Sequence, residues 1–324
     1  MSGLIAGFDA GQTHTRCRLA QIGHHRDWRL IAEGEGSGVS HLAALGGQER
    51  FCEALRSSLQ AALAAAERSL KESAPHGRGA QLVAAAVGAS GIEQDTVVQD
   101  LAWTLAGQTL SLARNRLWVS GDERTALRGA LGNRPGVVLI SGTGCIAVGQ
   151  DGSGRQHRCG GWGWLLDGAG SALDIGRDGL AVSVQMADGR RSDSQLRERL
   201  WEALGASTAQ DVKTAVVAPG FGPAGFAGMA PVVARAAAEG DREALRILER
   251  SARALAEMAI TVSRSLGLQA PLICPVGGAV ENLMVLRQEL EQTLHTLCPE
   301  AVIKAPLADA CTGALALAAE LTAE

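Results

Sequence analysis

Three glycine-rich turns, each placed directly after a short apolar run, constrain the fold of this 324-residue chain more than any other feature. Short apolar runs bounded by turn residues predict buried strands, and a glycine turn lets backbone N–H groups approach a ligand closely. The three turns are Asp9-Ala10-Gly11-Gln12-Thr13, Ser141-Gly142-Thr143-Gly144 and Gly277-Gly278. The first also offers a carboxylate to hydrated Mg²⁺ and hydroxyls to phosphate, with an ordinary hairpin turn as the alternative. Together the turns predict an α/β protein that binds a phosphorylated small molecule.

Strand and helix patterns alternate along the chain and start twice with a hairpin. The predicted strands are 4–8, 16–22, 82–87, 117–120, 137–141, 145–149, 155–159 and 272–276, and the predicted helices are 48–72, 93–106, 172–186, 194–204, 231–239, 241–266, 281–297 and 308–321. Two α/β lobes fit this order better than one continuous doubly wound sheet. We expect a first lobe of residues 1–121, completed by the C-terminal helix in 308–324, and a second lobe of residues 122–307 with helical insertions.

The charge balance favours a small-molecule partner over nucleic acid or membrane. The chain has 30 basic and 34 acidic residues and a net charge of −4, so no global field attracts a polyanion or an anionic membrane. No Gly-Lys pair occurs, which excludes a nucleotide site of the Walker-A type. The aromatic residues, 4 Phe and 6 Trp, are too few and too scattered to form base-stacking platforms.

The cysteines and the N-terminal residues predict a cytoplasmic protein. The 7 cysteines are widely spaced and form no C-x-x-C pair, so neither a disulfide framework nor a zinc site is indicated. Asp9 interrupts the apolar N-terminal run, which leaves no signal-peptide core, and no long apolar stretch follows elsewhere. We therefore expect reduced thiols, no secretion and no membrane insertion.

Asp122 is the acidic side chain best placed for base chemistry. It follows the predicted strand 117–120 and opens a helix, so its carboxylate is expected at the end of a strand. Asp is also a favoured N-cap residue, and a purely structural role therefore predicts the same residue at this position.

Two further glycine segments have competing interpretations. Gly142-Thr143-Gly144 with Ala147 mimics the dinucleotide fingerprint G-x-G-x-x-A, but that fingerprint needs a helix after the loop. A strand is predicted there, which excludes NAD. Gly160-Gly161-Trp162-Gly163 places an indole between glycines, where it can cover the apolar face of a small polar ligand or anchor the fold. The binding interpretation is favoured.

The order of these motifs resembles the N-acetylglucosamine kinase branch of the BadF/BadG/BcrA/BcrD ATPase family over nearly the whole chain. The motifs are Asp9-x-Gly11-x-Thr13-x-Thr15, Val87-Gly88-Ala89-Ser90-Gly91, Ser120-Gly121-Asp122, Ile140-Ser141-Gly142-Thr143-Gly144, Cys159-Gly160-Gly161-Trp162-Gly163 and Gly277-Gly278-Ala279. The resemblance implies the two-lobed, ribonuclease H-like fold of actin, hexokinase and the heat-shock chaperones, with an ATP cleft between the lobes. It also implies an ATP- and Mg²⁺-dependent kinase acting on the 6-hydroxyl of an amino sugar, with N-acetylglucosamine as the first candidate.

The resemblance implies a role for each motif residue. Asp9 would bind Mg²⁺, and Asp122 would take the proton from the sugar 6-hydroxyl. The residues implied to hold the phosphates are Asp9, Gly11, Gln12, Thr13, Thr15, Ser141, Gly142, Thr143 and Gly144, and those implied to hold adenosine are Gly277, Gly278 and Ala279. The residues implied to line the sugar pocket are Ser40, Ser90, Asp122, Gly161, Trp162, Gly163 and Asp167.

The chain departs from the family pattern at two places that face the sugar in the family. The usual Gly-Asp-Glu-Gly-Ser is replaced by Asp167-Gly168-Ala169-Gly170-Ser171, and a common Asn is replaced by Ser40. A glucosamine kinase is therefore an alternative, because the Asp167 carboxylate can attract an ammonium group. A nucleotide-binding ATPase or regulatory protein without sugar kinase activity is also open, whereas the scattered cysteines disfavour an iron–sulfur activator.

The expected partners follow from this reading of the motifs and the charge balance. They are ATP and a small-molecule sugar, with no nucleic acid and no membrane, and a homodimer is compatible with the sequence.

Overall fold

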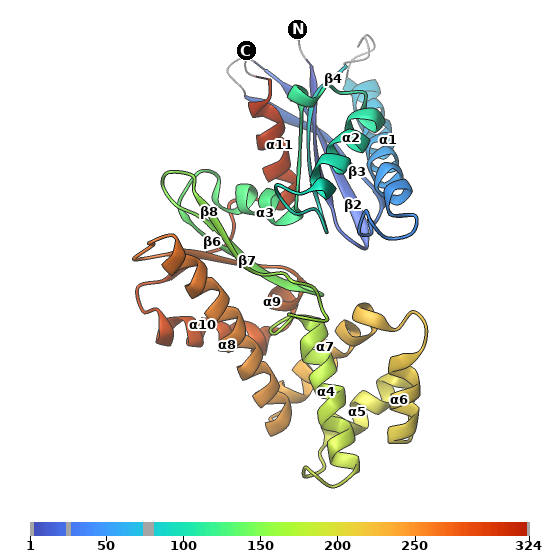
Figure 1. Ribbon diagram of the computed structural model, residues 1–324, viewed down its shortest axis with the longest axis vertical. Coiled ribbons are helices and arrows are strands. Elements are labelled where there is room, and N and C mark those ends of the chain that lie inside the picture. Colours follow the sequence, from blue (N-terminus) through green and yellow to red (C-terminus); the bar gives the residue numbers. More distant parts are fainter. Residues whose placement is uncertain (1–2, 24–26, 74–80, 323–324) are drawn as a thin grey trace. The chain divides into compact units, whose positions relative to one another are not determined.

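The computed structural model describes residues 3–23, 27–73 and 81–322, and its contacts divide the chain into two compact units (Figure 1). The first unit is Met1–Asn133 with Pro306–Glu324, and the second is Arg134–Ala305. Helix α3 (Asp122–Leu131) therefore belongs to the first unit, whereas the sequence placed the boundary after residue 121. The physical reason is its packing against α11 (Ala310–Glu320), where a Cβ on Gly313 would collide with the backbone of Gly129.

The first unit contains a five-stranded sheet with the order β3-β2-β1-β4-β5. The strands are β1 (Leu4–Ala10), β2 (His14–Ile22), β3 (Trp28–Ser37), β4 (Leu82–Ala89) and β5 (Leu117–Ser120). Strands β1, β2 and β3 form an antiparallel meander, and β4 and β5 run parallel to β1. The edge strand β3 was not predicted, because half-exposed polar residues and glycines interrupt its apolar pattern.

Helices cover both faces of this sheet (Figure 1). Helices α1 (Gly47–Ser73) and α2 (Val97–Leu110) share one core with the sheet, and α11 shares the core of the opposite face. Helix α1 lies close to β3 because Gly34 has no side chain where the backbone of Ala62 passes. Helix α2 begins later than the predicted helix 93–106, because Thr96 caps it through a hydrogen bond from the Gln99 N–H.

The second unit repeats this topology with a sheet of order β10-β9-β6-β7-β8. The strands are β6 (Gly136–Ser141), β7 (Cys145–Gln150), β8 (Gln156–Gly160), β9 (Leu272–Val276) and β10 (Val302–Ile303). Strands β6, β7 and β8 are antiparallel, and β9 and β10 run parallel to β6. The predicted second start with a hairpin is therefore confirmed.

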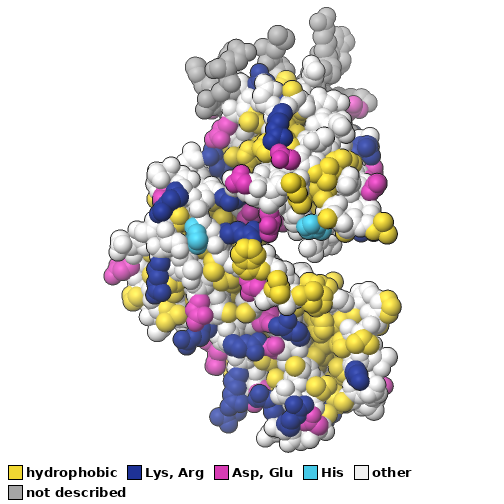
Figure 2. Space-filling model, in the orientation of Figure 1, with side chains coloured by type: hydrophobic (Ala, Val, Ile, Leu, Met, Phe, Trp, Pro, Cys, Tyr) yellow, Lys and Arg dark blue, Asp and Glu magenta, His cyan; other side chains and the backbone are white. Residues whose placement is uncertain are grey.

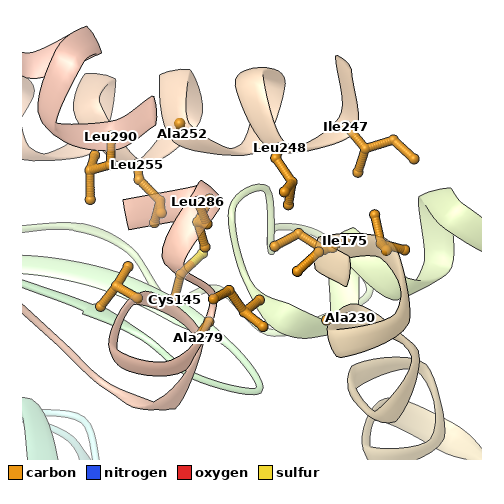
Figure 3. Packing of buried hydrophobic residues seen from close by; sticks show 14 of the residues in the cluster. Cys145, Ile175, Ala230, Ile247, Leu248, Ala252, Leu255, Ala279, Leu286 and Leu290 are labelled. Atoms are coloured by element: carbon orange, nitrogen blue, oxygen red, sulfur yellow. The ribbon is translucent and has the colours of Figure 1, made fainter. Parts of the chain in front are cut away.

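Seven helices of the second unit follow or interrupt the sheet within the described residues. They are α4 (Ala172–Ala187), α5 (Gln195–Leu204), α6 (Ala209–Val217), α7 (Gly222–Ala238), α8 (Arg242–Ser265), α9 (Gly278–Asn282) and α10 (Met284–Leu297). Figure 3 shows α8 contributing Leu248, Ala252 and Leu255 to a core that also holds Ile175 and Leu286.

Two helical predictions in this unit were wrong. Helix α6 was missed, and α7 starts at Gly222, whereas the sequence predicted a helix only from residue 231. The glycines of this segment read as a loop, but Gly176 of α4 leaves room for the Phe226 backbone, so tertiary packing supports the helix. Within the described residues, no helix has the length and apolar character needed to span a membrane.

Candidate active site

The carboxyl ends of the parallel strands β1, β4 and β5 meet at one edge of the first sheet. Asp9 of β1 is paired in register with Gly88 of β4, which is in turn paired with Ser120 of β5. The Ser90 N–H, just after β4, donates to Ala10 O at 3.0 Å. Open α/β sheets bind ligands at this edge, where the strand order reverses. The fold therefore brings Asp9 and Ser90 together with Asp122, which follows β5.

The turn between β1 and β2 is closed by backbone hydrogen bonds, and its tip is exposed. The Gly11 N–H donates to His14 O at 3.1 Å, and the Val39 N–H donates to Gly11 O at 2.9 Å. Gln12 and Thr13 lie at the exposed tip, where their N–H and hydroxyl groups are accessible. Thr15 is fully buried, because strand alternation places it on the core side of β2.

Two buried hydroxyls near this turn have no hydrogen-bond partner in the part of the chain that the structure describes. They are Oγ1 of Thr15 and Oγ of Ser40, which follows β3 at the same edge. A buried hydroxyl without a partner is unfavourable, so a ligand or water contact at this edge would satisfy it.

Asp9 is held at the edge by an ion pair that the sequence did not predict. Arg16 Nη2 lies 2.9 Å from Asp9 Oδ2, and Arg16 Nη1 lies 3.4 Å from Asp309 Oδ2. Asp309 also caps α11, where it accepts a hydrogen bond from the Thr312 N–H at 3.0 Å. The ion pair therefore holds the Asp9 carboxylate in a fixed, partly buried position.

Asp122 is the first residue of α3, and its N-cap is Gly121, so the N-cap interpretation of Asp122 does not hold. Burial raises the pKa of the Asp122 carboxyl to about 7, and the negative charges of Glu123 and Asp9 add to the effect. Hydrogen bonds from backbone N–H groups at the helix start oppose the shift only in part. A carboxyl group with a pKa near neutrality can both accept and release a proton under physiological conditions.

The second sheet carries its glycine turns at a single edge as well. Turn 141–144 joins β6 to β7, and β9 ends beside β6, with Val276 in register with Ile140. Gly277 has a φ of +102°, and a Cβ there would lie 2.6 Å from Ser141 O. Glycine is therefore required at position 277 for the two turns to lie against each other.

Turn 141–144 differs from the turn at Gly277, because Gly142 and Gly144 face open space. Apart from the glycine itself and its two chain neighbours, no atom of the described residues lies within 4 Å of where a Cβ on Gly142 or Gly144 would stand. Packing within the protein thus does not require glycine at these two positions. A ligand that approaches the backbone closely would require it, because a side chain would occupy the same space. The Ala172 N–H donates to Gly142 O at 2.9 Å, so this carbonyl points inward and Thr143 is exposed. Ala279, by contrast, is buried.

Segment 160–167 follows β8 at the same edge, because Gly160 pairs with Ile146 at the start of β7. Gly160, Gly161 and Gly163 all have positive φ, and Trp162 between them is 59% exposed (Figure 2 shows exposed side chains by type). The Arg158 guanidinium lies 4.5 Å from the Trp162 ring centre and supports the indole. The Asp167 N–H donates to Gly163 O at 2.8 Å.

The Asp167 carboxylate carries no cationic partner among residues 3–23, 27–73 and 81–322. It lies near Gly160, because a Cβ on that glycine would stand 3.5 Å from Asp167 Oδ2. Burial raises the pKa of the Cys145 thiol to about 12, and the charge of Asp167 contributes. The Asp167 carboxylate thus lies beside the Trp162 segment without a cationic partner among the described residues.

Sequence reasoning missed Arg16, Asp309 and Asp174. Arg16 and Asp309 are 293 positions apart, so no local pattern could have joined them. Asp174 is buried in the first turn of α4 and is paired with Arg177 and Arg250. Asp174 could have been found from the sequence, because an acidic residue three positions after a serine such as Ser171 is typical of a helix start.

Comparison with known proteins places the chain in a family. The sequence profile of the BadF/BadG/BcrA/BcrD ATPase family matches residues 6–318. An N-acetylmuramic acid/N-acetylglucosamine kinase from Clostridium acetobutylicum is 25% identical over 316 residues, 97% of each chain. An N-acetyl-D-glucosamine kinase from Dictyostelium discoideum is 30% identical over 240 residues, 72% of this chain and 74% of its own.

Solved structures agree with this assignment. A protein from Chromobacterium violaceum, provisionally described as an N-acetylglucosamine kinase, has a TM-score of 0.76 and 28% identity, with 98% of this chain and 99% of that chain covered. A glucokinase from Streptomyces griseus, in complex with glucose and AMPPNP, shares the fold with a TM-score of 0.55 at 14% identity, over 98% and 99% of the two chains. The predicted hexokinase-like fold class is confirmed, and the chain belongs to the BadF/BadG/BcrA/BcrD ATPase family.

Proposed function

We propose that this protein is an ATP-dependent kinase that phosphorylates the 6-hydroxyl of an amino sugar, with N-acetylglucosamine as the first candidate. The observation that carries the proposal is the Asp122 carboxyl, which has a pKa of about 7 and lies at the carboxyl edge of the first sheet, within electrostatic reach of Asp9. The names of the relatives from Clostridium acetobutylicum and Dictyostelium discoideum support the substrate class.

Each unit offers its own nucleotide contacts in this proposal. In the first unit these are backbone N–H groups of turn 11–13 for phosphate, and in the second unit those of turn 142–144 for phosphate and the turn at Gly277 and Gly278 for adenosine. Asp9 fits Mg²⁺, because that ion needs only one or two protein carboxylates when phosphate oxygens complete its coordination. When bound, Mg²⁺ neutralises charge on the transferring phosphoryl group.

The sugar is activated by Asp122. Its carboxylate accepts the 6-hydroxyl proton as that oxygen bonds to the γ-phosphorus, and the bond from the γ-phosphorus to the bridging oxygen of ADP breaks. Phosphoryl transfer depends on positioning and charge neutralisation, so one base and fixed donors suffice. Within the second unit, Trp162 covers an apolar face of the ring, and Gly161, Gly163 and Asp167 are its neighbouring sugar contacts. Ser40 and Ser90 are the proposed sugar contacts of the first unit.

Glucosamine is a second candidate acceptor, and the unpaired Asp167 carboxylate favours it. The ammonium of glucosamine would give this anion a partner, whereas the acetamide of N-acetylglucosamine offers only a neutral N–H donor.

Coupled ADP release over a sugar panel tests the proposed function. The panel contains N-acetylglucosamine, glucosamine, N-acetylmannosamine, glucose and N-acetylmuramic acid, each with Mg²⁺-ATP. We expect the highest kcat/KM for N-acetylglucosamine. ADP release that no sugar accelerates would instead identify a nucleotide-binding ATPase or regulatory protein.

The pH dependence of turnover should follow the ionisation of Asp122. Because the pKa of this carboxyl is about 7, kcat/KM is expected to rise between about pH 6 and about pH 8 as the base loses its proton. Stability should change in the opposite direction. The folded state keeps a proton that the unfolded state releases near pH 4, so this group makes the protein less stable as pH rises from about 4 to about 7.

Paired measurements check this prediction: kcat/KM with N-acetylglucosamine and the melting temperature, each at closely spaced pH values. Asp122→Asn is the control, because the part of the pH dependence of the melting temperature that comes from the Asp122 carboxyl should be absent in this variant. A kcat/KM that stays constant from pH 6 to pH 8 would contradict the role of Asp122.

Asp167→Asn should change which amino sugar is preferred. Loss of the negative charge is expected to lower kcat/KM for glucosamine, relative to N-acetylglucosamine, by roughly tenfold, because a charge-assisted hydrogen bond contributes more than a neutral one. Asp151→Asn is the matched control, since Asp151 lies in the β7–β8 turn at the opposite end of these strands. An unchanged ratio between the two sugars would refute the charge argument.

A further inference from the structure

Four hydrogen bonds join residues 141–145 to the residues that follow the Trp162 segment, one of them from the Leu173 N–H to Thr143 O at 3.4 Å. Ser141 Oγ donates to Gly170 O at 2.8 Å, and Cys145 Sγ donates to Ala169 O at 3.3 Å. The Ala172 N–H donates to Gly142 O at 2.9 Å. Ser141 is fully buried, so its hydroxyl faces this connection and not a ligand.

The connection has little room to adjust at Gly170. This residue has a φ of +97°, and a Cβ there would lie 2.5 Å from the Leu255 side chain and 2.9 Å from Ser251 O. The next residue, Ser171, caps α4 by accepting a hydrogen bond from the Asp174 N–H at 3.2 Å. The chain at 169–172 is therefore fixed between the start of α4 and helix α8.

The same short segment leads directly back to the proposed sugar contacts. Asp167 lies two positions before Ala169, and its N–H is bonded to Gly163 O, so Trp162 and Asp167 belong to one continuous loop with the connection. A shift of this loop on sugar binding would change the hydrogen bonds to Ser141 and Cys145, because packed interiors have few intermediate arrangements.

We propose that Ser141 is a positioning residue that couples the two substrates: sugar bound at the 160–167 loop sets the geometry of turn 141–144 and so tightens nucleotide binding. This inference rests on the proposed function, because it takes the loop as the sugar contact and the turn as the phosphate contact. Linkage requires the effect to be reciprocal, so bound nucleotide must tighten sugar binding by the same factor.

Isothermal titration of the full chain tests the coupling. The probes are a non-hydrolysable ATP analogue with Mg²⁺, titrated with and without saturating N-acetylglucosamine, and the reverse titration. For the unmodified protein we expect the sugar to tighten nucleotide binding by about fivefold or more. For Ser141→Ala we expect a tightening below about twofold, whatever the affinity for either ligand alone, because the buried link to Gly170 is lost.

Ser263→Ala is the matched control. Ser263 is buried in α8 and also donates a hydrogen bond to a backbone carbonyl, that of Ala259 at 2.8 Å. Its replacement removes a buried hydroxyl of the same unit while the coupling should stay at its original value, which separates positioning by Ser141 from the general effect of losing a buried hydroxyl.

The outcomes distinguish this inference from the proposed function. If neither probe binds, the proposed function fails. If both probes bind independently in the unmodified protein, or if Ser141→Ala keeps the full coupling, the function stands and the inference is overturned.

Discussion

Asp122→Asn should produce a folded protein that still binds Mg²⁺-ATP, but its kcat with N-acetylglucosamine should be lower by about 10²-fold or more. The amide keeps the shape of the side chain but cannot accept the 6-hydroxyl proton. Steady-state kcat for sugar-dependent ADP release measures the loss, and titration with a non-hydrolysable ATP analogue checks nucleotide binding.

Folding is not expected to limit this variant. Gly121 is the N-cap of α3, so no capping side chain is removed. Burial and neighbouring charge make the charged form of the Asp122 carboxyl unfavourable in the folded protein. The amide of Asn is neutral and removes this unfavourable charge, so the melting temperature at pH 8 should not fall. Asp100→Asn is the matched control, because Asp100 is also a carboxylate in the first turn of a helix, the exposed start of α2. This variant should leave turnover unchanged. Near-normal turnover by a stable Asp122→Asn protein would remove the proposed base.

Asp9→Asn should abolish the dependence of nucleotide affinity on Mg²⁺. Asp9 is the carboxylate proposed to bind the ion. In the variant, Arg16 keeps its ion pair with Asp309 but loses the one with Asp9. We expect Mg²⁺ to tighten ATP binding in the unmodified protein by about tenfold or more, and to change it little in the variant, because carboxylate oxygens are preferred ligands of this ion. Titration of ATP in Mg²⁺ and in EDTA measures both values.

Glu33→Gln is a suitable control for Asp9→Asn. Glu33 lies in β3 of the same sheet and is also paired with an arginine, Arg18, so its loss removes a comparable ion pair. The control should keep the response to Mg²⁺. If Asp9→Asn keeps it too, Asp9 does not bind the ion.

The sequence predicted the parts of the site that depend on local pattern. The turns after β1, β6 and β9 were recognised because glycine directly follows a short buried strand, and residue order alone placed Asp122 after β5. These signals also predicted the two α/β units, since each of the two hairpins is followed farther along the chain by alternating helices and strands.

Features that depend on distant contacts were not predicted. The apolar pattern of the edge strand β3 is interrupted by polar residues and glycines, so the strand is identified by its pairing with β2 and by the approach of α1 at Gly34. The Arg16 link between Asp9 and Asp309 joins residues from opposite ends of the chain. The pKa of Asp122 depends on burial and on the nearby Glu123 and Asp9, which the sequence does not place in space.

The position of phosphate on the product tests the central claim most directly. Incubation of the unmodified protein with Mg²⁺-ATP and ¹³C-labelled N-acetylglucosamine should yield a sugar whose C6 carbon resonance is split by coupling to phosphorus, and the 6-deoxy sugar should yield no phosphorylated product. Phosphate found on a different hydroxyl, or no phosphorylated sugar although both substrates bind, would contradict the account.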